Sequence, residues 1–296
     1  MCIKEHTHKP NHTIKVHKYG RLYARSEFFM DKLFNLSGKV AVVTGGSRGL
    51  GYSMSEAFLL AGAAKVYVSS RSESACDEAA QALNDLANQH KLNGRAFSAA
   101  ADCSSDGGVN KLFELVSAKE SKVDILASNA GAHWGAEFGN HTGEAFDMVL
   151  GLNVKGVFLT IQAFAPLLVK AGSVGSPSRV IVTGSVLGLS NTFSGGGYGY
   201  LSSKAAVHHL VKSLSVELGP ENITVNAVAP GVFPTKMTDG VIDSFGDTLI
   251  ESNPLRRLGK PEDIMGAVVY LCSGAGSYVN GAILPLDGGF HLSGFS

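Results

Sequence analysis

Short apolar runs rich in β-branched residues alternate with longer helical stretches from residue 38 onward. Short runs bounded by turn residues are typical of buried strands, and longer stretches with helical spacing indicate helices packed on a core. We expect strands at residues 39–44, 65–70, 95–100, 123–128, 179–183, 223–228 and 282–286. We expect one helix to follow a glycine turn and end at residue 62, and others at residues 73–90, 108–120, 143–170, 200–218 and 261–273.

This alternation predicts the fold class. Strands that alternate with helices of this length form a parallel sheet covered on both faces, and right-handed crossovers leave a doubly wound sheet. We therefore expect an α/β protein: a single-domain, Rossmann-like, doubly wound parallel sheet of about seven strands. The 296 residues suit one large domain, which we place at residues 32–296. The Gly/Ser-rich stretch at 184–199 is a loop, because core elements continue on both sides.

Residues 1–31 form a separate basic leader. Residues 1–30 carry six Lys and Arg against two Asp and Glu, together with His6, His8, His12 and His17. The leader has no continuous apolar segment, so it is not a secretory signal peptide. We interpret it as a solvated flexible tail of a cytoplasmic protein, with a mitochondrial presequence as the alternative. The histidine spacings make no fixed metal site, and we predict no metal.

Composition and charge exclude several classes of protein. Hydrophobic residues make up 45% and charged residues 17%, which excludes a disordered chain. No uninterrupted apolar run approaches the roughly 18 residues of a membrane span, so we expect none. The 25 basic residues balance 25 acidic ones, which disfavours nucleic acid as a partner. No C-x-x-C pair is present, so we expect reduced thiols at Cys2, Cys76, Cys103 and Cys272.

A glycine turn follows the first predicted strand, in the sequence Thr44-Gly-Gly-Ser-Arg-Gly-Leu-Gly51. Backbone N–H groups at a helix N-terminus bind phosphate when no Cβ blocks the approach, and Gly45, Gly49 and Gly51 keep that path open. The spacing T-G-x-x-x-G-x-G differs from the commoner dinucleotide pattern G-x-G-x-x-G. A plain strand-to-helix turn is the alternative.

With the motifs that follow, the chain resembles the short-chain dehydrogenase/reductase family from about Lys32 to its C-terminus. The landmarks, in order, are the glycine turn, Asp102, Ser128-Asn-Ala-Gly131, Asn153-Val-Lys-Gly156, Ser185, Tyr200-Leu-Ser-Ser-Lys204, Pro230-Gly231 and Thr235. Ser128 stands where the family often has a second asparagine. The resemblance implies an oxidoreductase that binds an extended nicotinamide dinucleotide.

The resemblance also implies which residues bind that dinucleotide. Asp102 would accept a hydrogen bond from the adenine, Asn129 and Gly131 would line the adenosine ribose, and Thr235 would meet the carboxamide or pyrophosphate. As alternatives, Asp102 could cap a helix and Asn129 could form a turn. The complete set of expected cofactor-binding residues is Gly45, Ser47, Arg48, Gly49, Leu50, Gly51, Arg71, Asp102, Cys103, Asn129, Ala130, Gly131, Tyr200, Lys204, Pro230, Gly231, Phe233 and Thr235.

Charge indicates which nicotinamide cofactor is used. NAD sites place a carboxylate about 20 residues past the glycines, where it binds the ribose 2′-hydroxyl. This chain has Ser69-Ser70-Arg71 there, without a carboxylate. Arginine binds a 2′-phosphate in bidentate fashion, and Arg48 could reach the same phosphate from the glycine turn. Either arginine alone could be a solvated surface charge, but the pair favours NADP(H).

Tyr200 and Lys204 are four residues apart on a predicted helix, so their side chains share one face. A phenol has a pKa near 10, which a nearby ammonium and the positive nicotinamide of the oxidised cofactor would lower. Tyr200 could then act as the acid or base for a carbonyl or alcohol. Ser185 would orient the carbonyl oxygen, and by resemblance Asn153 would hold a water that links Lys204 to solvent. Tyr198 does not share the helical face of Lys204.

Each of these residues also has an ordinary structural interpretation. Ser185 could be a turn hydroxyl, Tyr200 a half-buried helix aromatic and Lys204 a surface charge, although their joint order argues against this. Ser185 and Tyr200 are 15 residues apart, slightly more than is usual in the family. We expect residues 195–197, all glycine, to absorb the excess and to reshape the substrate pocket.

Within the family, residues 253–263 and 286–289 look like those of 3-oxoacyl-thioester reductases, and residues 198–200 and 229–237 are similar to the rhamnolipid-type ketoacyl reductases. We therefore expect NADPH-dependent reduction of a 3-oxoacyl thioester or apolar ketone to a secondary alcohol. A polyol or keto-sugar oxidoreductase, and a non-catalytic NADP(H)-binding regulatory protein, are the alternatives. We expect apolar residues at the mouth of the site, namely Trp134, Leu187, Leu189, Phe193, Phe233 and Met237.

Family members commonly pair through two long helices, which correspond here to residues 143–170 and 200–218. The first of these is apolar on more than one face, which is consistent either with an interface or with a buried helix. We expect a homotetramer or homodimer whose other partner is a small-molecule carbonyl or alcohol substrate.

Overall fold

A computed structural model describes residues 32–190 and 196–293 of the chain. The leader at 1–31 and the mouth residue Phe193 lie outside the described residues. The described chain forms one seven-stranded sheet. Its strands are β1 (Val40–Thr44), β2 (Lys65–Ser69), β3 (Arg95–Ser98), β4 (Ile125–Ser128), β5 (Ser178–Thr183), β6 (Ile223–Pro230) and β7 (Ile283–Leu286).

The strand order is β3-β2-β1-β4-β5-β6-β7, and every neighbouring pair is parallel. The order reverses direction between β1 and β4, which makes this point the topological switch where open α/β sheets bind ligands. Thr44, at the end of β1, is level with Ser69 of β2 and with Ser128 of β4. The carboxyl ends of the three strands therefore face one crevice.

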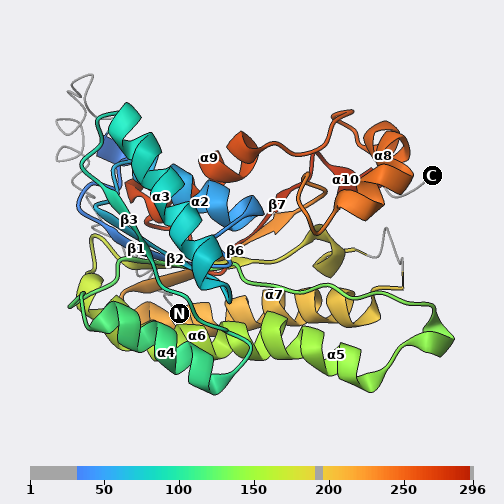
Figure 1. The fold of residues 1–296 in the computed structure, drawn as a ribbon, viewed down its shortest axis with the longest axis horizontal. Helices are drawn as coiled ribbons and strands as arrows, with labels where there is room; N and C mark the ends of the chain where they lie inside the picture. Colours follow the sequence, from blue (N-terminus) through green and yellow to red (C-terminus); the bar gives the residue numbers. More distant parts are fainter. Residues whose placement is uncertain (1–31, 191–195, 294–296) are drawn as a thin grey trace, which may run out of the picture.

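Helices cover both faces of the sheet, which confirms the predicted doubly wound architecture (Figure 1). One face packs against α2 (Gly49–Leu60), α3 (Glu73–Gln89) and α9 (Pro261–Cys272). The other face packs against α4 (Asp106–Ser117), α6 (Val157–Ala171) and α7 (Tyr198–Leu218). Strands β1 and β4 are buried along their whole length, as parallel strands between two helical layers must be.

Two helix predictions need correction. The helix expected at 143–170 consists of α5 (Gly143–Leu150), a π-helical turn η3 (Gly151–Gly156) and α6. Helix α8 (Asp239–Ser252) was not predicted, because it contains two glycines and buries only Leu249, so its apolar periodicity is weak. The short helix at Phe290–Ser293 was also not predicted, and the other predicted strands and helices lie within a few residues of their expected ranges.

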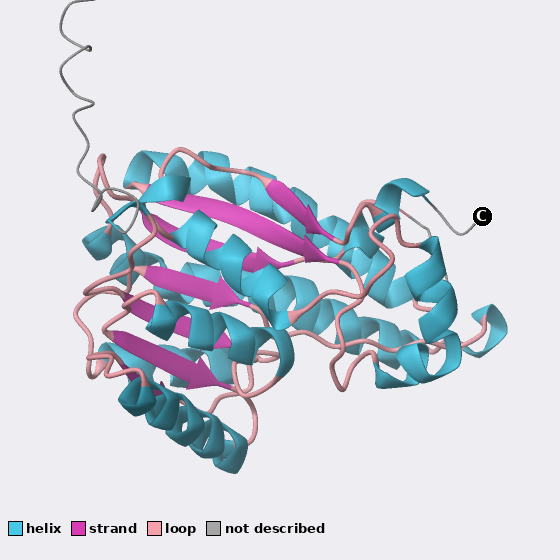
Figure 2. Ribbon diagram, turned by 90° about the horizontal axis from the view of Figure 1, so that it is seen from above, coloured by secondary structure: helices cyan, strands magenta, loops and turns pink. Residues whose placement is uncertain are grey.

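All seven strands point the same way, and their carboxyl ends meet a layer of loops that carries α8 and α10 (Phe290–Ser293) (Figure 2). Among the described residues, one helical stretch, Gly143–Ala171, is long and apolar enough to cross a membrane by length and composition alone. Part of it is buried in the fold, where α6 packs against β4 and β5.

Candidate active site

The glycine turn connects β1 to α2 in a conformation that needs glycine. Gly45 and Gly49 have φ angles of +64° and +54°, which side chains rarely adopt. A Cβ on Gly51 would lie 2.2 Å from the Gly45 carbonyl oxygen and 2.5 Å from the Asn129 Nδ2. The helix N-terminus therefore lies against the sheet, and its first N–H groups face outward without side chains in front of them.

Asn129 holds this turn in place. Its Nδ2 donates to the Thr44 carbonyl (3.0 Å) and the Gly45 carbonyl (3.2 Å), while its Oδ1 accepts from the Thr183 hydroxyl (3.0 Å). The Thr44 hydroxyl in turn accepts hydrogen bonds from the backbone N–H groups of Asn129 and Ala130, each at 3.0 Å. The Asn129 side chain therefore ties β1, β4 and β5 together at the switch point, and its contact with a ribose stays a prediction.

Three more of the expected cofactor-binding residues, Asp102, Cys103 and Thr235, differ in which of their atoms a ligand could contact. The Asp102 carboxylate accepts from the Ser104 N–H (3.0 Å), and Ser105 caps α4, so the helix-cap alternative for Asp102 is wrong. The Cys103 side chain is buried, and this burial raises the pKa of its thiol to about 11. Only the backbone of Cys103 can therefore face a dinucleotide. Thr235 lies at the glycine turn, where a Cβ on Gly49 would be 3.3 Å from its Cγ2.

Arg48 and Arg71 lie on the two segments that flank the end of β2. The Gly46 N–H donates to the Ser69 carbonyl at 3.0 Å, so the glycine turn and the end of β2 are hydrogen-bonded to each other. Both arginines are exposed, and neither guanidinium makes a hydrogen bond or ion pair with another part of the described chain. The predicted pair of cations is therefore present without a competing carboxylate.

Lys204 is a buried cation on α7. Its side chain is almost inaccessible, and its Nζ donates to the Thr183 carbonyl at 2.7 Å. Burial lowers the pKa of Lys204 to about 8. The Nζ lies 5.5 Å from the centre of the Tyr200 ring, so the two side chains share a helical face as predicted.

Tyr200 faces Ser185 across the site. Burial raises the pKa of Tyr200 above its ordinary value, and a hydrogen bond with Ser185 lowers it by a smaller amount. The pKa of Tyr200 is therefore raised and not lowered as expected beside Lys204, because loss of solvation on burial is the largest effect. Ser185 begins the short helix η4 (Val186–Gly188), where its Oγ accepts from the Leu187 N–H at 3.2 Å.

Asn153 lies on η3, the π-helical turn, a type of irregularity that often marks functional sites. Its side chain accepts from the Ala132 N–H (2.8 Å) and donates to the Ala132 carbonyl and the Ser203 hydroxyl (both 2.9 Å). A Cβ on Gly131 would lie 3.3 Å from the Asn153 Oδ1 and 3.8 Å from the Lys204 Nζ. The amide therefore fixes the segment after β4 beside Lys204, and the water expected at Asn153 stays a prediction.

The predicted apolar mouth is only partly present. Leu189 and Met237 are exposed, and Trp134 and Leu187 are partly buried. Phe233 is wrong as a mouth residue, because its ring is buried in the core against Gly259, and its place among the cofactor-binding residues stays a prediction. Pro230 is the last residue of β6 and Gly231 follows it. The Gly231 N–H donates to the Leu286 carbonyl at the end of β7, at 3.0 Å.

His133 and His141, which the sequence did not indicate, lie against the aromatic rings of Trp134, Tyr198 and Tyr200. The ring centre of His133 lies 5.1 Å from that of Tyr200, and His141 lies 4.6 Å from Trp134 and 5.6 Å from Tyr198, each pair edge to face. His133 and His141 follow β4 in an irregular segment without a periodic sequence pattern, so their positions could not be predicted before the fold was known.

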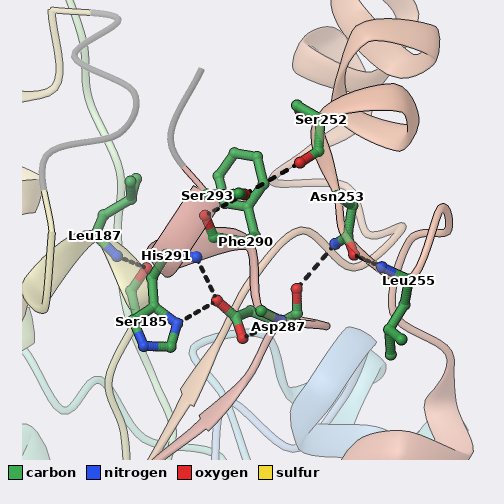
Figure 3. A network of polar contacts seen from close by, with 10 residues as sticks. Ser185, Leu187, Ser252, Asn253, Leu255, Asp287, Phe290, His291 and Ser293 are labelled. Carbon is green, nitrogen blue, oxygen red and sulfur yellow. Dashed lines mark hydrogen bonds and ion pairs between the residues drawn. The ribbon is translucent and has the colours of Figure 1, made fainter. Parts of the chain in front are cut away.

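A separate cavity of about 330 Å³ lies between α8, the start of α9 and the end of β7. Asp287 lies beside this cavity, and its carboxylate accepts from the backbone N–H of His291 and pairs with the Nδ1 of the same histidine (Figure 3). The backbone carbonyl of Asp287 accepts a hydrogen bond from the side-chain amide of Asn253. These contacts anchor α10, and Phe290 of α10 packs with Val186 of η4. The cavity is not lined by Tyr200, Lys204 or Ser185, so it is not the candidate active site.

Comparisons with known proteins agree with this geometry. A family model described as enoyl-(acyl carrier protein) reductase matches residues 45–291. The chain is 38% identical over 265 residues to the rhamnolipids biosynthesis 3-oxoacyl-(acyl-carrier-protein) reductase of Pseudomonas aeruginosa, covering 89% of this chain and 100% of that protein. The chain therefore belongs to the short-chain dehydrogenase/reductase family and is an oxidoreductase of that class.

Two solved structures show the same fold with a dinucleotide. The Pseudomonas aeruginosa RhlG/NADP active-site complex has a TM-score of 0.82 and 37% identity, with 88% of this chain and 99% of that chain covered. A gluconate 5-dehydrogenase from Burkholderia cenocepacia in complex with NADP and tartrate has a TM-score of 0.80 and 27% identity, with coverages of 88% and 98%. The relatives thus include proteins named for substrates of very different polarity.

Proposed function

We propose that this protein uses NADPH to reduce a carbonyl group, in a 3-oxoacyl thioester or an apolar ketone, to a secondary alcohol, with Tyr200 as the proton donor. The observation that carries the proposal is the convergence of Ser185, Tyr200 and Lys204 next to the glycine turn at the topological switch. A non-catalytic nucleotide-binding protein would have no need for this arrangement.

The cofactor assignment to NADP(H) rests on the shape and charge of the turn. Side-chain-free N–H groups at the start of α2 suit a pyrophosphate, and unpaired Arg48 and Arg71 suit a 2′-phosphate. A 2′-hydroxyl alone would leave both cations without a partner. Lys204 would hold the nicotinamide ribose, and Asn129 and Gly131 would line the adenosine ribose. The NADP complexes of two relatives support the same assignment.

Tyr200, Ser185 and Lys204 would each have one role in the reduction. Bound NADPH would supply the hydride for the carbonyl carbon. Tyr200 keeps its proton at neutral pH, because burial raises its pKa, and can donate it to the carbonyl oxygen. The Ser185 Oγ accepts from the Leu187 N–H and is hydrogen-bonded to Tyr200, and its O–H would turn to donate to that carbonyl oxygen when substrate binds. Lys204, held by Thr183, places a cation where Tyr200 becomes an anion.

The polarity of the mouth favours an apolar substrate. Trp134, Leu187, Leu189 and Met237 would leave the hydroxyls of a sugar unpaired, at roughly 1–3 kcal/mol for each buried group. The relative named for 3-oxoacyl-(acyl-carrier-protein) supports this choice. The gluconate 5-dehydrogenase and the imidazoles of His133 and His141 favour the second candidate, a polyol or keto-sugar oxidoreductase.

The first prediction tests substrate and chemistry together. NADPH oxidation is measured with a panel of 3-oxoacyl thioesters, diketones and keto-sugars. We expect the highest kcat/KM for an apolar ketone or thioester, and a loss of about 10²- to 10⁴-fold in Tyr200→Phe, the scale of general acid catalysis. Tyr278→Phe is the matched control, because Tyr278 is fully exposed and lies in the segment before β7, outside the site.

Two outcomes would contradict the proposal. Higher efficiency on keto-sugars or polyols would overturn the substrate assignment, and near-normal turnover in Tyr200→Phe would overturn the mechanism. A protein that binds NADPH but turns over no member of the panel would support the non-catalytic alternative.

A further inference from the structure

His208 is a buried imidazole directly behind the serine of the candidate site. It lies on α7 four residues after Lys204 and eight after Tyr200, so the three side chains follow one side of the helix. Only 4% of its surface is exposed. The roles proposed above for Ser185, Tyr200 and Lys204 make no use of it, and a polar ring in such a position needs a hydrogen-bonding reason.

The backbone around Ser185 is shaped to receive this ring. The Ser185 N–H donates to the His208 Nε2 at 3.4 Å. A Cβ on Gly184 would lie 2.1 Å from that Nε2, and a Cβ on Gly188 would lie 2.8 Å from the His208 Cε1. Glycines therefore stand on both sides of the serine turn where any side chain would displace the imidazole.

The protonation state of the ring follows from its surroundings. Burial, together with the positive charges of Lys204 and Lys212, lowers the pKa of His208 to about 4, so the imidazole is neutral at pH 7. The Ser185 N–H can only donate, so the Nε2 accepts and the neutral ring carries its proton on Nδ1, which is buried without a hydrogen-bond partner among the described residues. A neutral ring with its proton on Nδ1 leaves a lone pair on Nε2 for Ser185.

We propose that His208 is a positioning residue that sets the orientation of Ser185, an inference that rests on the proposed function. The imidazole holds the Ser185 N–H, while the Leu187 N–H holds the Ser185 Oγ. Two bonds from opposite directions fix the serine so that its hydroxyl faces Tyr200. Without the acceptor behind it, the turn would leave a buried N–H unpaired and would rotate to satisfy it.

The test compares three variants with a shared readout. His208→Leu removes the acceptor, His208→Gln places an amide oxygen near the position of Nε2, and His209→Leu changes the exposed neighbour on the same helix. We expect kcat to fall roughly 10- to 100-fold in His208→Leu, the scale of a misplaced catalytic group, with the Kd for NADPH little changed. His208→Gln should restore most of kcat, and His209→Leu should behave as the unmodified protein.

A double-mutant cycle separates positioning from simple packing. If His208 acts through Ser185, adding His208→Leu to Ser185→Ala should lower kcat by less than about twofold further. Independent, multiplicative losses would overturn the proposal, and so would equal losses in His208→Gln and His208→Leu.

Nitrogen-15 NMR of the imidazole tests the contact without any turnover. At pH 7, the histidine signal that disappears in His208→Gln should carry its proton on Nδ1, and a proton on Nε2 would overturn the proposal. This measurement remains decisive if His208→Leu does not fold. Absence of turnover in the unmodified protein, with the expected Nδ1 proton present, would count against the proposed function while confirming the contact.

Discussion

Lys204, His208 and Tyr200 differ in charge at neutral pH, and each has a different physical reason for its protonation state. Lys204 keeps a cation close to neutral pH because a backbone carbonyl solvates its ammonium. His208, next to that cation, is kept neutral, since a second buried charge would have no partner. Tyr200 retains its proton because burial disfavours the phenolate. At neutral pH the site therefore presents one cation, one acceptor and one proton donor, which is the state that carbonyl reduction needs.

The buried His208 should make stability depend on pH. Its pKa is 6.5 in a model peptide and about 4 in the folded chain, so between these values the unfolded chain binds a proton that the folded chain does not. Acid therefore favours unfolding, and the free energy of unfolding should fall by up to about 3 kcal/mol from this group as the pH drops from 6.5 to 4. Urea unfolding of the unmodified protein and of His208→Gln measures the difference.

The control for this prediction is His209→Gln on the exposed face of α7. It should leave the pH dependence as it is in the unmodified protein. Parallel stability curves for the unmodified protein and His208→Gln across this range would show that His208 is not buried as a neutral group.

Arg71 should determine the choice between the two nicotinamide cofactors. Its guanidinium makes no hydrogen bond or ion pair among the described residues, so Arg71→Ala removes no internal contact that the structure shows. We expect Arg71→Ala to weaken NADPH binding by roughly 1.5–3 kcal/mol, the value of a charge-assisted hydrogen bond, while NADH binding hardly changes. Fluorescence titration with both cofactors measures this. Similar affinities of the unmodified protein for NADH and NADPH would contradict the assignment.

At the scale of elements, two helical glycines should respond to alanine with opposite sign. In α2, a Cβ on Gly51 would meet the Gly45 carbonyl oxygen at 2.2 Å, so Gly51→Ala should push α2 off β1 and cost about 1–3 kcal/mol of stability. In α9, Gly266 is exposed with open space around its Cβ position, so Gly266→Ala should stabilise the protein by roughly 0.5–1 kcal/mol. Thermal unfolding with NADPH titration measures both effects. A neutral Gly51→Ala would show that the helix does not need its close approach to the turn.

The same scale shows which elements could be predicted from sequence. The strands were predictable because β1, β4 and β6 are buried throughout and are short runs of mostly apolar residues. Helix α8 was missed since one buried leucine gives no period. The π-helical turn was invisible because its six residues continue the composition of the helices on either side. It is tertiary hydrogen bonds from Asn153, not local propensity, that give this turn its role.

At the scale of the whole molecule, the site was predictable to the extent that it depends on topology. Glycine turn, Asn129, Ser185 and Thr235 each follow a strand, and the carboxyl ends of parallel strands meet at one edge of the sheet (Figure 2). Side chains in the loops beyond that edge have no such constraint. This is why Phe233 was placed at the mouth although it packs in the core, and why His133 and His208 were overlooked.

The last prediction concerns self-association. Helices α6 and α7 cover the same face of the sheet (Figure 1), and each leaves apolar side chains exposed: Phe158 and Val169 on α6, and Val216, which is 77% exposed, on α7. Exposed apolar groups on long helices are typical of an interface, so we expect a homodimer or homotetramer through this face.

Val216→Asp would bury an unpaired charge there and should weaken association by roughly 3–5 kcal/mol. Light scattering at micromolar concentration should show a smaller mass for this variant, and an unchanged mass for Val174→Asp, whose valine is exposed outside both helices. A monomeric unmodified protein, or an unaltered mass in Val216→Asp, would rule out this interface.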